Sequence, residues 1–183
     1  MKAVLISIKP QWCELIASGE KTVEVRKTQP KLATPFKVYI YETQGRTETP
    51  FVDEEGHHIF KGRGQVIGEF VCDKICEFEN DWFDGSFWET VEKSCMEADR
   101  LARYIGNKDY GYGWHISNLV IYDEPRELGE FNQVRAIRGY HKQDEPKTEG
   151  INIPKLLNSS RVEVKYLTRP PQSWCYVEEL EGV

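Results

Sequence analysis

The sequence predicts an α+β fold, a small mixed β-barrel with one helix at the barrel mouth and a second, inserted helix. Segments in which apolar and polar residues alternate, as they do in strands, recur along the 183 residues. Strands and helices do not alternate regularly after residue 30, which argues against a parallel α/β sheet. A long amphipathic segment, residues 86–105, interrupts this β-rich order with apolar residues at helical spacing. We therefore expect that helix to pack over one opening of the barrel.

The chain opens with a predicted β-α-β unit. Residues 3–8 are apolar on both faces, which is typical of a central strand. Pro10 suits the first position of a helix, and Gly19 suits the residue just after its end, where a left-handed backbone is common. A strand over residues 22–27 follows, and its side chains alternate between two faces.

Five further strands are predicted from alternation and from β-branched and aromatic residues. The helix over residues 86–105 begins with Ser86 and Glu89 at the spacing of a capping box, and Gly106 ends it. A loop is expected over residues 108–113 and a helical turn over residues 125–131. The strands cover residues 36–42, 66–78 with a bend near Asp73 and Lys74, 114–122, 161–167 and 174–180.

The chain is expected to form one domain over residues 1–183, because no internal repeat and no linker divides it. Insertions are expected at about residues 43–64 and 79–113, and the charged, turn-rich residues 139–150 are expected to be mobile. No tract approaches the ~20 apolar residues of a membrane span, and the N-terminus has no secretory apolar core. We therefore expect a cytoplasmic protein with no membrane contact.

The cysteines and histidines do not form a metal-binding pattern. Cys72 and Cys76 are four residues apart with no second pair beside them, which favours reduced, buried thiols over a zinc site. The adjacent His57 and His58 would point to opposite sides of a strand and cannot chelate one ion together. No metal and no cofactor is therefore expected.

Charge is unevenly distributed along the chain. The net charge is −6, which argues against a protein that coats nucleic acid. Residues 1–40, however, contain seven Lys and Arg residues and three Glu residues, a local balance of +4, so the rest of the chain carries −10. A basic patch on an acidic body can bind phosphate and restricts where a polyanion can lie.

The most informative stretch is residues 19–26, Gly-Glu-Lys-Thr-Val-Glu-Val-Arg. It places Lys21, Glu24 and Arg26 at the turn between the first helix and the second strand, where small ligands often bind. A simpler interpretation is an ion pair between Glu24 and Arg26, which share a strand face.

The pattern Gly19-x-Lys21-x-x-Glu24-x-Arg26, together with the preceding strand and helix, resembles the signature of the ASCH domain, a relative of the PUA-like RNA-binding folds. Residues 113–117 and 169–174 are similar to features of a larger, phage and bacterial branch of that family. The resemblance implies a PUA-like barrel that binds RNA, or a single nucleotide or modified base.

The candidate binding residues follow from this resemblance and from their chemistry. Lys9, Lys21 and Arg26 are expected to hold phosphate, and Glu24 to accept a hydrogen bond from a base edge. Trp12 and Trp114 are candidates for stacking a base, although each is also a candidate core residue. The full set of candidates is Lys9, Trp12, Lys21, Thr22, Glu24, Arg26, Trp114, and the pair His115 and Ser117, which are expected to share a strand face.

Two other functions remain open from the sequence. Some small ASCH proteins resemble amidohydrolases that deacylate N4-acetylcytidine with a Gly-x-Lys-Thr-x-Thr-x-Arg pattern. This chain has Glu24 in place of the second Thr, so its candidate catalytic residues are Lys21 as a base and Glu24 as its orienting partner. The third candidate is a regulatory protein-interaction domain, which predicts a large exposed apolar patch on the helix over residues 86–105.

Overall fold

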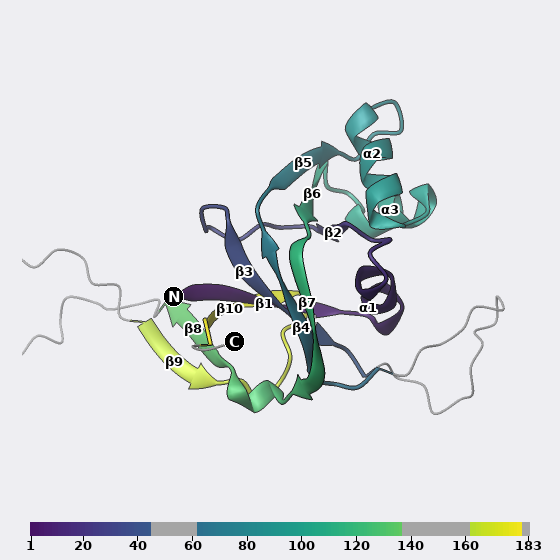
Figure 1. Cartoon of the computed structure of the whole chain (residues 1–183). Coiled ribbons are helices and arrows are strands. Elements are labelled where there is room, and N and C mark those ends of the chain that lie inside the picture. Colours follow the sequence, from purple (N-terminus) through teal and green to yellow (C-terminus); the bar gives the residue numbers. More distant parts are fainter. Residues whose placement is uncertain (45–61, 137–161, 181–183) are drawn as a thin grey trace, which may run out of the picture.

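The computed structural model describes residues 1–44, 62–136 and 162–180 (Figure 1). Within these ranges it has ten strands, three α-helices and one short 3₁₀ helix, which confirms the predicted α+β class. None of the described helices has the length and hydropathy to cross a bilayer. The elements in chain order are β1 (Lys2–Ile8), α1 (Pro10–Ala17), β2 (Val23–Arg26), β3 (Phe36–Glu42), β4 (Val66–Cys72), β5 (Ile75–Glu79), α2 (Gly85–Ser94), α3 (Ala98–Ile105), β6 (Tyr110–His115), β7 (Ser117–Arg126), η1 (Leu128–Glu130), β8 (Asn132–Ala136), β9 (Val162–Tyr166) and β10 (Trp174–Glu178).

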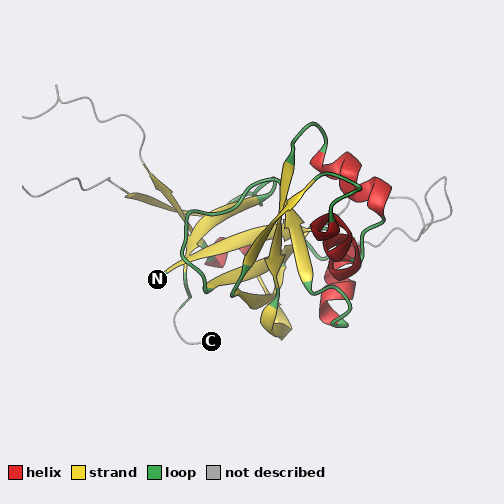
Figure 2. Ribbon diagram, turned by 90° about the horizontal axis from the view of Figure 1, so that it is seen from above, coloured by secondary structure: helices red, strands yellow, loops and turns green. Residues whose placement is uncertain are grey.

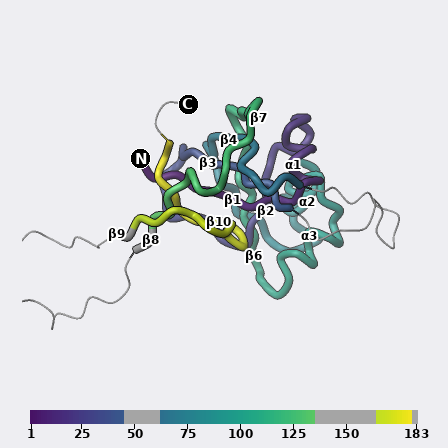
Figure 3. Tube along the Cα trace, turned by 90° about the horizontal axis from the view of Figure 1, so that it is seen from below, coloured from purple at the N-terminus to yellow at the C-terminus, as the bar shows by residue number. Residues whose placement is uncertain are grey.

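Seven strands form one large sheet in the order β7-β4-β3-β1-β10-β8-β9. Its neighbours pair antiparallel except β1 and β3, which are parallel. The order begins and ends on different strands, so the sheet is open rather than a closed barrel. The three α-helices gather at one end of the molecule and the β8–β9 hairpin lies at the other (Figures 2 and 3).

Strand β1 lies in the middle of the large sheet, as the two-sided hydrophobicity of its sequence predicts. Val4, Ile6 and Ile8 are buried in one core cluster with α1, while Ala3 and Leu5 are buried in a second cluster on the opposite face. Burial on both faces is typical of a central strand. The first helix and the second strand are therefore held against a rigid base.

A second, three-stranded sheet has the order β2-β6-β5 and supports helices α2 and α3. Its own small core contains Val25 of β2, Phe78 of β5 and Phe87 of α2, together with Leu101 and Ile105 of α3. This core fixes the helix pair beside β2. The insertion predicted at about residues 79–113 is thus a packed unit next to the N-terminal turn.

The prediction of a single helix over residues 86–105 is wrong in detail, because the structure has two helices there. Cys95 has a left-handed backbone (φ 55°) that ends α2, and Glu97 is extended before α3 begins. The N-cap is Asp84, whose carboxylate accepts from the Ser86 backbone N–H, and not Ser86 itself. The aromatic residue that α2 buries is Phe87, whereas the neighbouring Trp88 is 46% exposed. No Gly or Pro marks the break, so the sequence gives little sign of it.

Several predicted strands are divided or extended in the structure. The strand predicted over residues 66–78 bends at Asp73 and Lys74, as expected, but the bend separates β4 and β5 into different sheets. The strand predicted over residues 114–122 is broken at Ile116, and the loop predicted over residues 108–113 belongs mostly to β6.

Other differences lie nearer the C-terminal half. The sequence patterns do not predict strand β8, and the helical turn is confined to η1. Most of the insertion predicted at about residues 43–64, including His57 and His58, lies outside the described residues, as do residues 139–150.

A prediction for the sheet concerns Gly68, where β4 approaches β7 very closely. A Cβ atom at Gly68 would lie 2.4 Å from the Val120 backbone oxygen, so Gly68→Ala must displace a strand. Because overpacking of this kind is destabilising, we expect Gly68→Ala to lower the free energy of unfolding by about 1–3 kcal/mol. Urea denaturation measures this change. The control is Gly85→Ala, since a Cβ there meets nothing within 4 Å. Equal stability of the two variants would contradict this close contact.

Candidate functional site

The site begins at the turn that follows α1. Gly19 has φ 81°, a conformation that favours glycine, and its backbone N–H donates to the Ile16 carbonyl at 3.0 Å. The Lys21 N–H then donates to the Leu15 carbonyl at 2.8 Å, so the chain folds back against the helix. This reversal directs the Lys21 side chain inward. The predicted role of Gly19 as the residue after the helix end is confirmed.

Lys21 is a buried cation whose hydrogen-bonding capacity is filled within the protein. The residue is only 2% exposed, and its Nζ donates to the carbonyl oxygens of Val23 at 2.8 Å and Ser94 at 2.9 Å. The third neighbour is a Glu24 carboxylate oxygen at 3.3 Å. An ammonium group has three protons, so all three have an acceptor. Ser94 is the last residue of α2, where a positive charge is favoured by the helix dipole.

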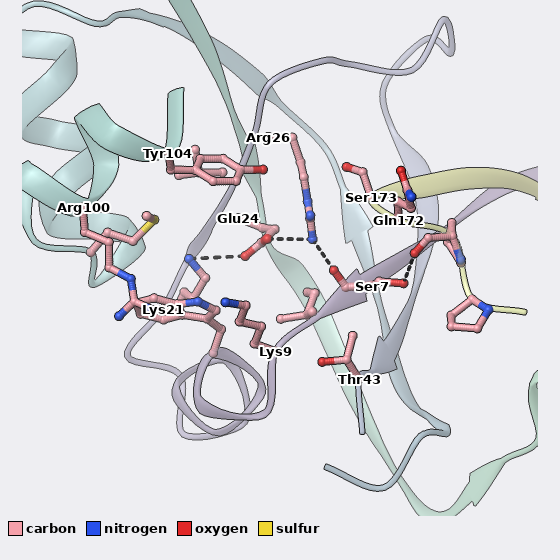
Figure 4. A pocket seen from close by; sticks show the side chains of 16 residues that line it. Ser7, Lys9, Lys21, Glu24, Arg26, Thr43, Arg100, Tyr104, Gln172 and Ser173 are labelled. Atoms are coloured by element: carbon pink, nitrogen blue, oxygen red, sulfur yellow. Dashed lines mark hydrogen bonds and ion pairs between the residues drawn. The ribbon is translucent and has the colours of Figure 1, made fainter. Parts of the chain in front are cut away.

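Glu24 lies between Lys21 and Arg26. Its Oε2 faces Lys21 and its Oε1 contacts Arg26 Nη2 at 2.9 Å, so the ion pair considered from the sequence is present. The same Nη2 donates to the Ser7 carbonyl at 2.7 Å, which ties β2 to the end of β1. All three charged side chains are buried, and Figure 4 shows the ion pairs that join them. The buried Arg26 Nε has no partner among the described residues.

These residues form one side of a cavity of about 560 Å³. That size falls in the range of small-molecule sites. The cavity lies between the turn after β1, helix α1, strand β2, helix α3 and the segment before β10. It is lined by Ser7, Ile8, Lys9, Trp12, Lys21, Glu24, Val25, Arg26, Thr43, Met96, Arg100, Tyr104, Pro170, Pro171, Gln172 and Ser173.

The cavity is positive although the whole chain is negative. Among the described residues, its lining includes the cations Lys9, Lys21, Arg26 and Arg100 and the single carboxylate of Glu24, a formal balance of +3, whereas the full chain carries −6. Lys9 and Arg100 are exposed and form no ion pair with any described carboxylate. The buried cations are therefore neutralised by Glu24, whereas Arg100 is held by the neutral Gln11 amide and the Trp12 ring and keeps its charge, as does Lys9.

Aromatic rings complete the walls. The Arg100 guanidinium carbon lies 4.7 Å from the centre of the Trp12 ring, and Lys21 Nζ lies 5.2 Å from it. Both arrangements are within the range of cation–π contact. Tyr104 lies near Arg26, and burial raises the pKa of its phenol while the Arg26 guanidinium partly opposes that rise. Tyr104 therefore stays a neutral hydrogen-bonding group at physiological pH.

Five of the residues predicted for the site come together in this cavity, and four do not. The five that line it come from the end of β1, from α1, from β2 and from the turn before β2, and they are Lys9, Trp12, Lys21, Glu24 and Arg26. The four that lie elsewhere are Thr22, Trp114, His115 and Ser117.

Each of these four residues has a different role. Thr22 is exposed, and its backbone N–H donates to the Lys93 carbonyl. Trp114 is 0% exposed and belongs to the main core, packed against Phe36 and Trp174. The pair His115 and Ser117 does not share a strand, because β6 ends at His115 and β7 begins at Ser117. His115 Nδ1 contacts the Asp73 carboxylate at 2.6 Å, which lowers the pKa of Asp73, and Ser117 donates to the Val71 carbonyl.

Sequence reasoning did not assign Arg100, Tyr104 or the segment over residues 170–173 to the site, although it noted residues 169–174 as a family-like feature. Arg100 and Tyr104 belong to α3, a separate helix that the prediction of one continuous helix over residues 86–105 did not include. The segment over residues 170–173 is held to β1 because Ser7 Oγ donates to the Pro171 carbonyl at 2.7 Å and the Ser7 N–H donates to the Ser173 carbonyl at 2.9 Å. These contacts join residues more than 160 positions apart, and no local pattern reports them.

Comparisons with known proteins agree with this architecture. A model of the ASCH domain matches residues 6–123, more than half of the chain. The crystal structure of ASCH from Zymomonas mobilis is similar with a TM-score of 0.50, at 20% identity over 69% of this chain and 73% of that one. Crystal structures of two single-substitution variants of the Zymomonas protein give TM-scores of 0.49 and 0.48 at 20% identity, covering 70% and 69% of this chain and 77% and 74% of theirs. A search of curated proteins found no match.

A prediction for the site is that Lys21 stabilises the fold. Lys21→Met removes the ammonium group from three acceptors and leaves Glu24 and the Ser94 carbonyl without it. Because breaking a buried ion pair leaves a charge unpaired, we expect the variant to lose about 3–5 kcal/mol of unfolding free energy. Chemical denaturation measures this loss. The control Lys9→Met changes an exposed lysine and should stay within about 0.5 kcal/mol of the parent protein. Similar stabilities for both variants would contradict a structural role for Lys21.

Proposed function

Because the chain belongs to the ASCH domain family, whose fold is PUA-like, we propose that it binds single-stranded RNA by holding one nucleotide in the cavity between α1, β2 and α3. The observation that carries the proposal is the formal charge of the described residues that line the cavity, +3 on a chain of −6. Four cations are gathered around a hollow of about 560 Å³, and this favours an anionic ligand with a compact, partly buried portion.

The exposed cations at the rim are the phosphate-binding groups of this proposal. Lys9 precedes the first turn of α1, and Arg100 projects from α3 on the facing wall. Neither is neutralised by a described carboxylate, whereas Lys21 and Arg26 are. The guanidinium of Arg100 offers a planar fork to phosphate oxygens, and the ammonium of Lys9 offers a point charge. The sequence suggests Lys21 and Arg26 as phosphate-binding groups together with Lys9. In this proposal Lys9 and Arg100 bind phosphate, and Lys21 and Arg26 hold Glu24.

The Glu24 carboxylate is the base-reading group. Each of its oxygens contacts one cation, and each oxygen retains a second lone pair that can accept another hydrogen bond. Lys21 and Arg26 fix its orientation, so it presents acceptors in a constant direction. Carboxylates accept hydrogen bonds from the exocyclic amine of cytosine, and a base with such an amine is the ligand that this group favours.

Stacking is the role of the Trp12 ring and of the plane of the Arg100 guanidinium, whose N–H edge binds phosphate. The guanidinium of Arg100 lies over the Trp12 ring, and both flat groups belong to the cavity wall. Unpaired bases stack on aromatic rings and on Arg guanidinium planes in single-stranded RNA complexes. Trp114, which the sequence also suggests for stacking, is in the core and has no part in binding.

Two further lysines favour a strand over a free nucleotide. Lys27 Nζ lies 5.2 Å from the centre of the Tyr104 ring, and Lys108 Nζ donates to the Lys27 carbonyl at 3.0 Å. Both are exposed and neither pairs with a described carboxylate. They continue the positive surface from the cavity past Tyr104, where the phosphate of a neighbouring nucleotide would lie.

An amidohydrolase is the second candidate, and the contact between Lys21 and Glu24 at 3.3 Å favours it by placing a base and a carboxylate together in the cavity. The reaction also needs a nucleophile. Among the described lining residues, the Ser7 hydroxyl donates to the Pro171 carbonyl, and all three Lys21 protons are bonded. Burial raises the pKa of the nearby Cys13 thiol far above its usual range, which keeps it protonated. Binding is therefore the better supported function.

Arg100→Ala is predicted to weaken RNA binding. In fluorescence titrations with a short single-stranded RNA, loss of one phosphate contact should lower the slope of log K against log salt by about 0.7. Arg103→Ala is the matched control, because Arg103 is an exposed arginine of the same helix that does not line the cavity. The proposal fails if both variants bind as the parent protein does, or if both lose affinity equally. A mononucleotide should bind more weakly than the oligonucleotide in the same titration.

The enzyme candidate is tested by incubating the protein with N4-acetylcytidine and following cytidine release by chromatography. We expect no release, because Glu24 replaces the second Thr of the deacylase pattern and the Ser7 hydroxyl of the cavity donates to the Pro171 carbonyl. Release by the parent protein that is lost in Glu24→Gln would replace the binding proposal with the enzyme. Release that persists in Glu24→Gln would indicate a contaminating activity.

A further inference from the structure

The turn that leads into α2, together with the first turn of that helix, exposes three large aromatic side chains within seven residues. Phe83 is 98% exposed, Trp88 is 46% exposed and Trp82 is 45% exposed. Scattered exposed apolar residues are common on protein surfaces, but a contiguous group of aromatic residues marks an interaction site. Tryptophan in particular contributes strongly to protein–protein binding. We call these three residues the aromatic surface.

The backbone beneath the aromatic surface is well ordered by hydrogen bonds. The Asp84 N–H donates to the Asp81 carbonyl at 3.0 Å, and the Phe83 N–H donates to the Asp81 side chain at 3.0 Å. Asp84 then caps α2 through the Ser86 N–H. The exposure of Phe83 is therefore a property of a fixed turn.

The two tryptophans are also fixed. Trp88 Nε1 donates to the Trp82 carbonyl at 2.8 Å, and the two rings meet edge to face with centroids 5.7 Å apart. Trp82 stacks on the buried Phe87 at 5.8 Å, which anchors the group to the small core. A partner would thus meet a preorganised surface and order few side chains on binding.

The charge around the aromatic surface selects the kind of partner. Residues 75–92 contain six Asp and Glu residues and no Lys or Arg, and they outnumber the three lysines near them, Lys74 and Lys93 at the two ends of this range and Lys108 beside Asn80. Among them Glu79, Asp81 and Glu89 are exposed, and of these three only Glu89 has a described ion-pair partner, Lys93. Such a surface repels nucleic acid, and it repels the same surface of a second copy. It attracts a segment that combines Lys or Arg with apolar side chains.

We propose that Trp82, Phe83 and Trp88 form a docking surface for a basic segment of a partner protein. Phe83 inserts between apolar side chains of that segment, and its Lys or Arg residues face Glu79 and Asp81 and stack on the tryptophans. Helix α2 stands at the top of Figure 1, on the three-stranded sheet, and none of the three aromatic residues lines the cavity. The docking proposal does not depend on the RNA-binding proposal. A chain with both features binds RNA in the cavity and a protein partner at the aromatic surface.

The test is a selection from a random peptide library displayed on phage, using the immobilised full chain. Peptides that bind the parent protein are counter-selected on Phe83→Ser, a variant that loses no core contact because Phe83 is exposed. We expect the enriched peptides to carry at least one apolar residue flanked by Lys or Arg. Synthetic copies should bind the parent protein at least tenfold more tightly than Phe83→Ser, and more weakly as salt is raised.

Two control comparisons check that the peptides bind at the aromatic surface. Glu20→Gln removes one exposed carboxylate far along the chain from the aromatic surface, and Asp81→Asn removes one beside Phe83, so only Asp81→Asn should weaken peptide binding. Arg100→Ala should leave peptide binding unchanged whether or not the cavity binds RNA. The proposal is overturned if the selection yields no peptide that distinguishes the parent protein from Phe83→Ser, or if the enriched peptides lack basic residues.

Discussion

The structure depends on one buried carboxylate, Glu24, held between the ammonium of Lys21 and the guanidinium of Arg26. Burying an ion costs several kcal/mol, so three of them are tolerated only because each is paired and hydrogen-bonded. The bonds reach the Ser7 carbonyl in β1 and the Ser94 carbonyl at the end of α2. One network thus joins the large sheet, the small sheet and the helix pair. The cavity exists because these three parts are held at fixed positions around it.

The motif Gly19-x-Lys21-x-x-Glu24-x-Arg26 is expected from the sequence both to shape the site and to bind its ligand. The structure separates these two roles. Gly19 and Lys21 set the turn and secure α2, and Arg26 secures β1. The exposed rim cations are supplied by other parts of the chain, Lys9 before α1 and Arg100 in α3. The motif therefore builds the cavity, and residues outside it give the cavity most of its free positive charge.

The sequence predicted the parts of the fold that local patterns encode. The strand, helix, Gly19 and second strand of the opening unit were all found, as was the position of the bend at Asp73. The open sheet and the break at Cys95 depend on distant contacts, so no local pattern predicts them, and the choice between core and site for Trp114 is decided only by the structure. The site divides in the same way. Its members in the opening unit are close in sequence, so the sequence predicts that they lie together. Arg100 and Tyr104 reach the cavity only because a new helix, α3, begins after Glu97.

The central claim is that the cavity beside Glu24 is where RNA binds, and chemical-shift mapping by NMR tests it most directly. The isotopically labelled protein would be titrated with a short single-stranded RNA while backbone, indole and arginine side-chain signals are followed. The account predicts the largest shifts at Trp12, Arg100, Tyr104 and residues 170–173, with small shifts in β8 and β9. Shifts confined to residues away from the cavity, or no shifts at an RNA concentration far above that of the protein, would contradict it.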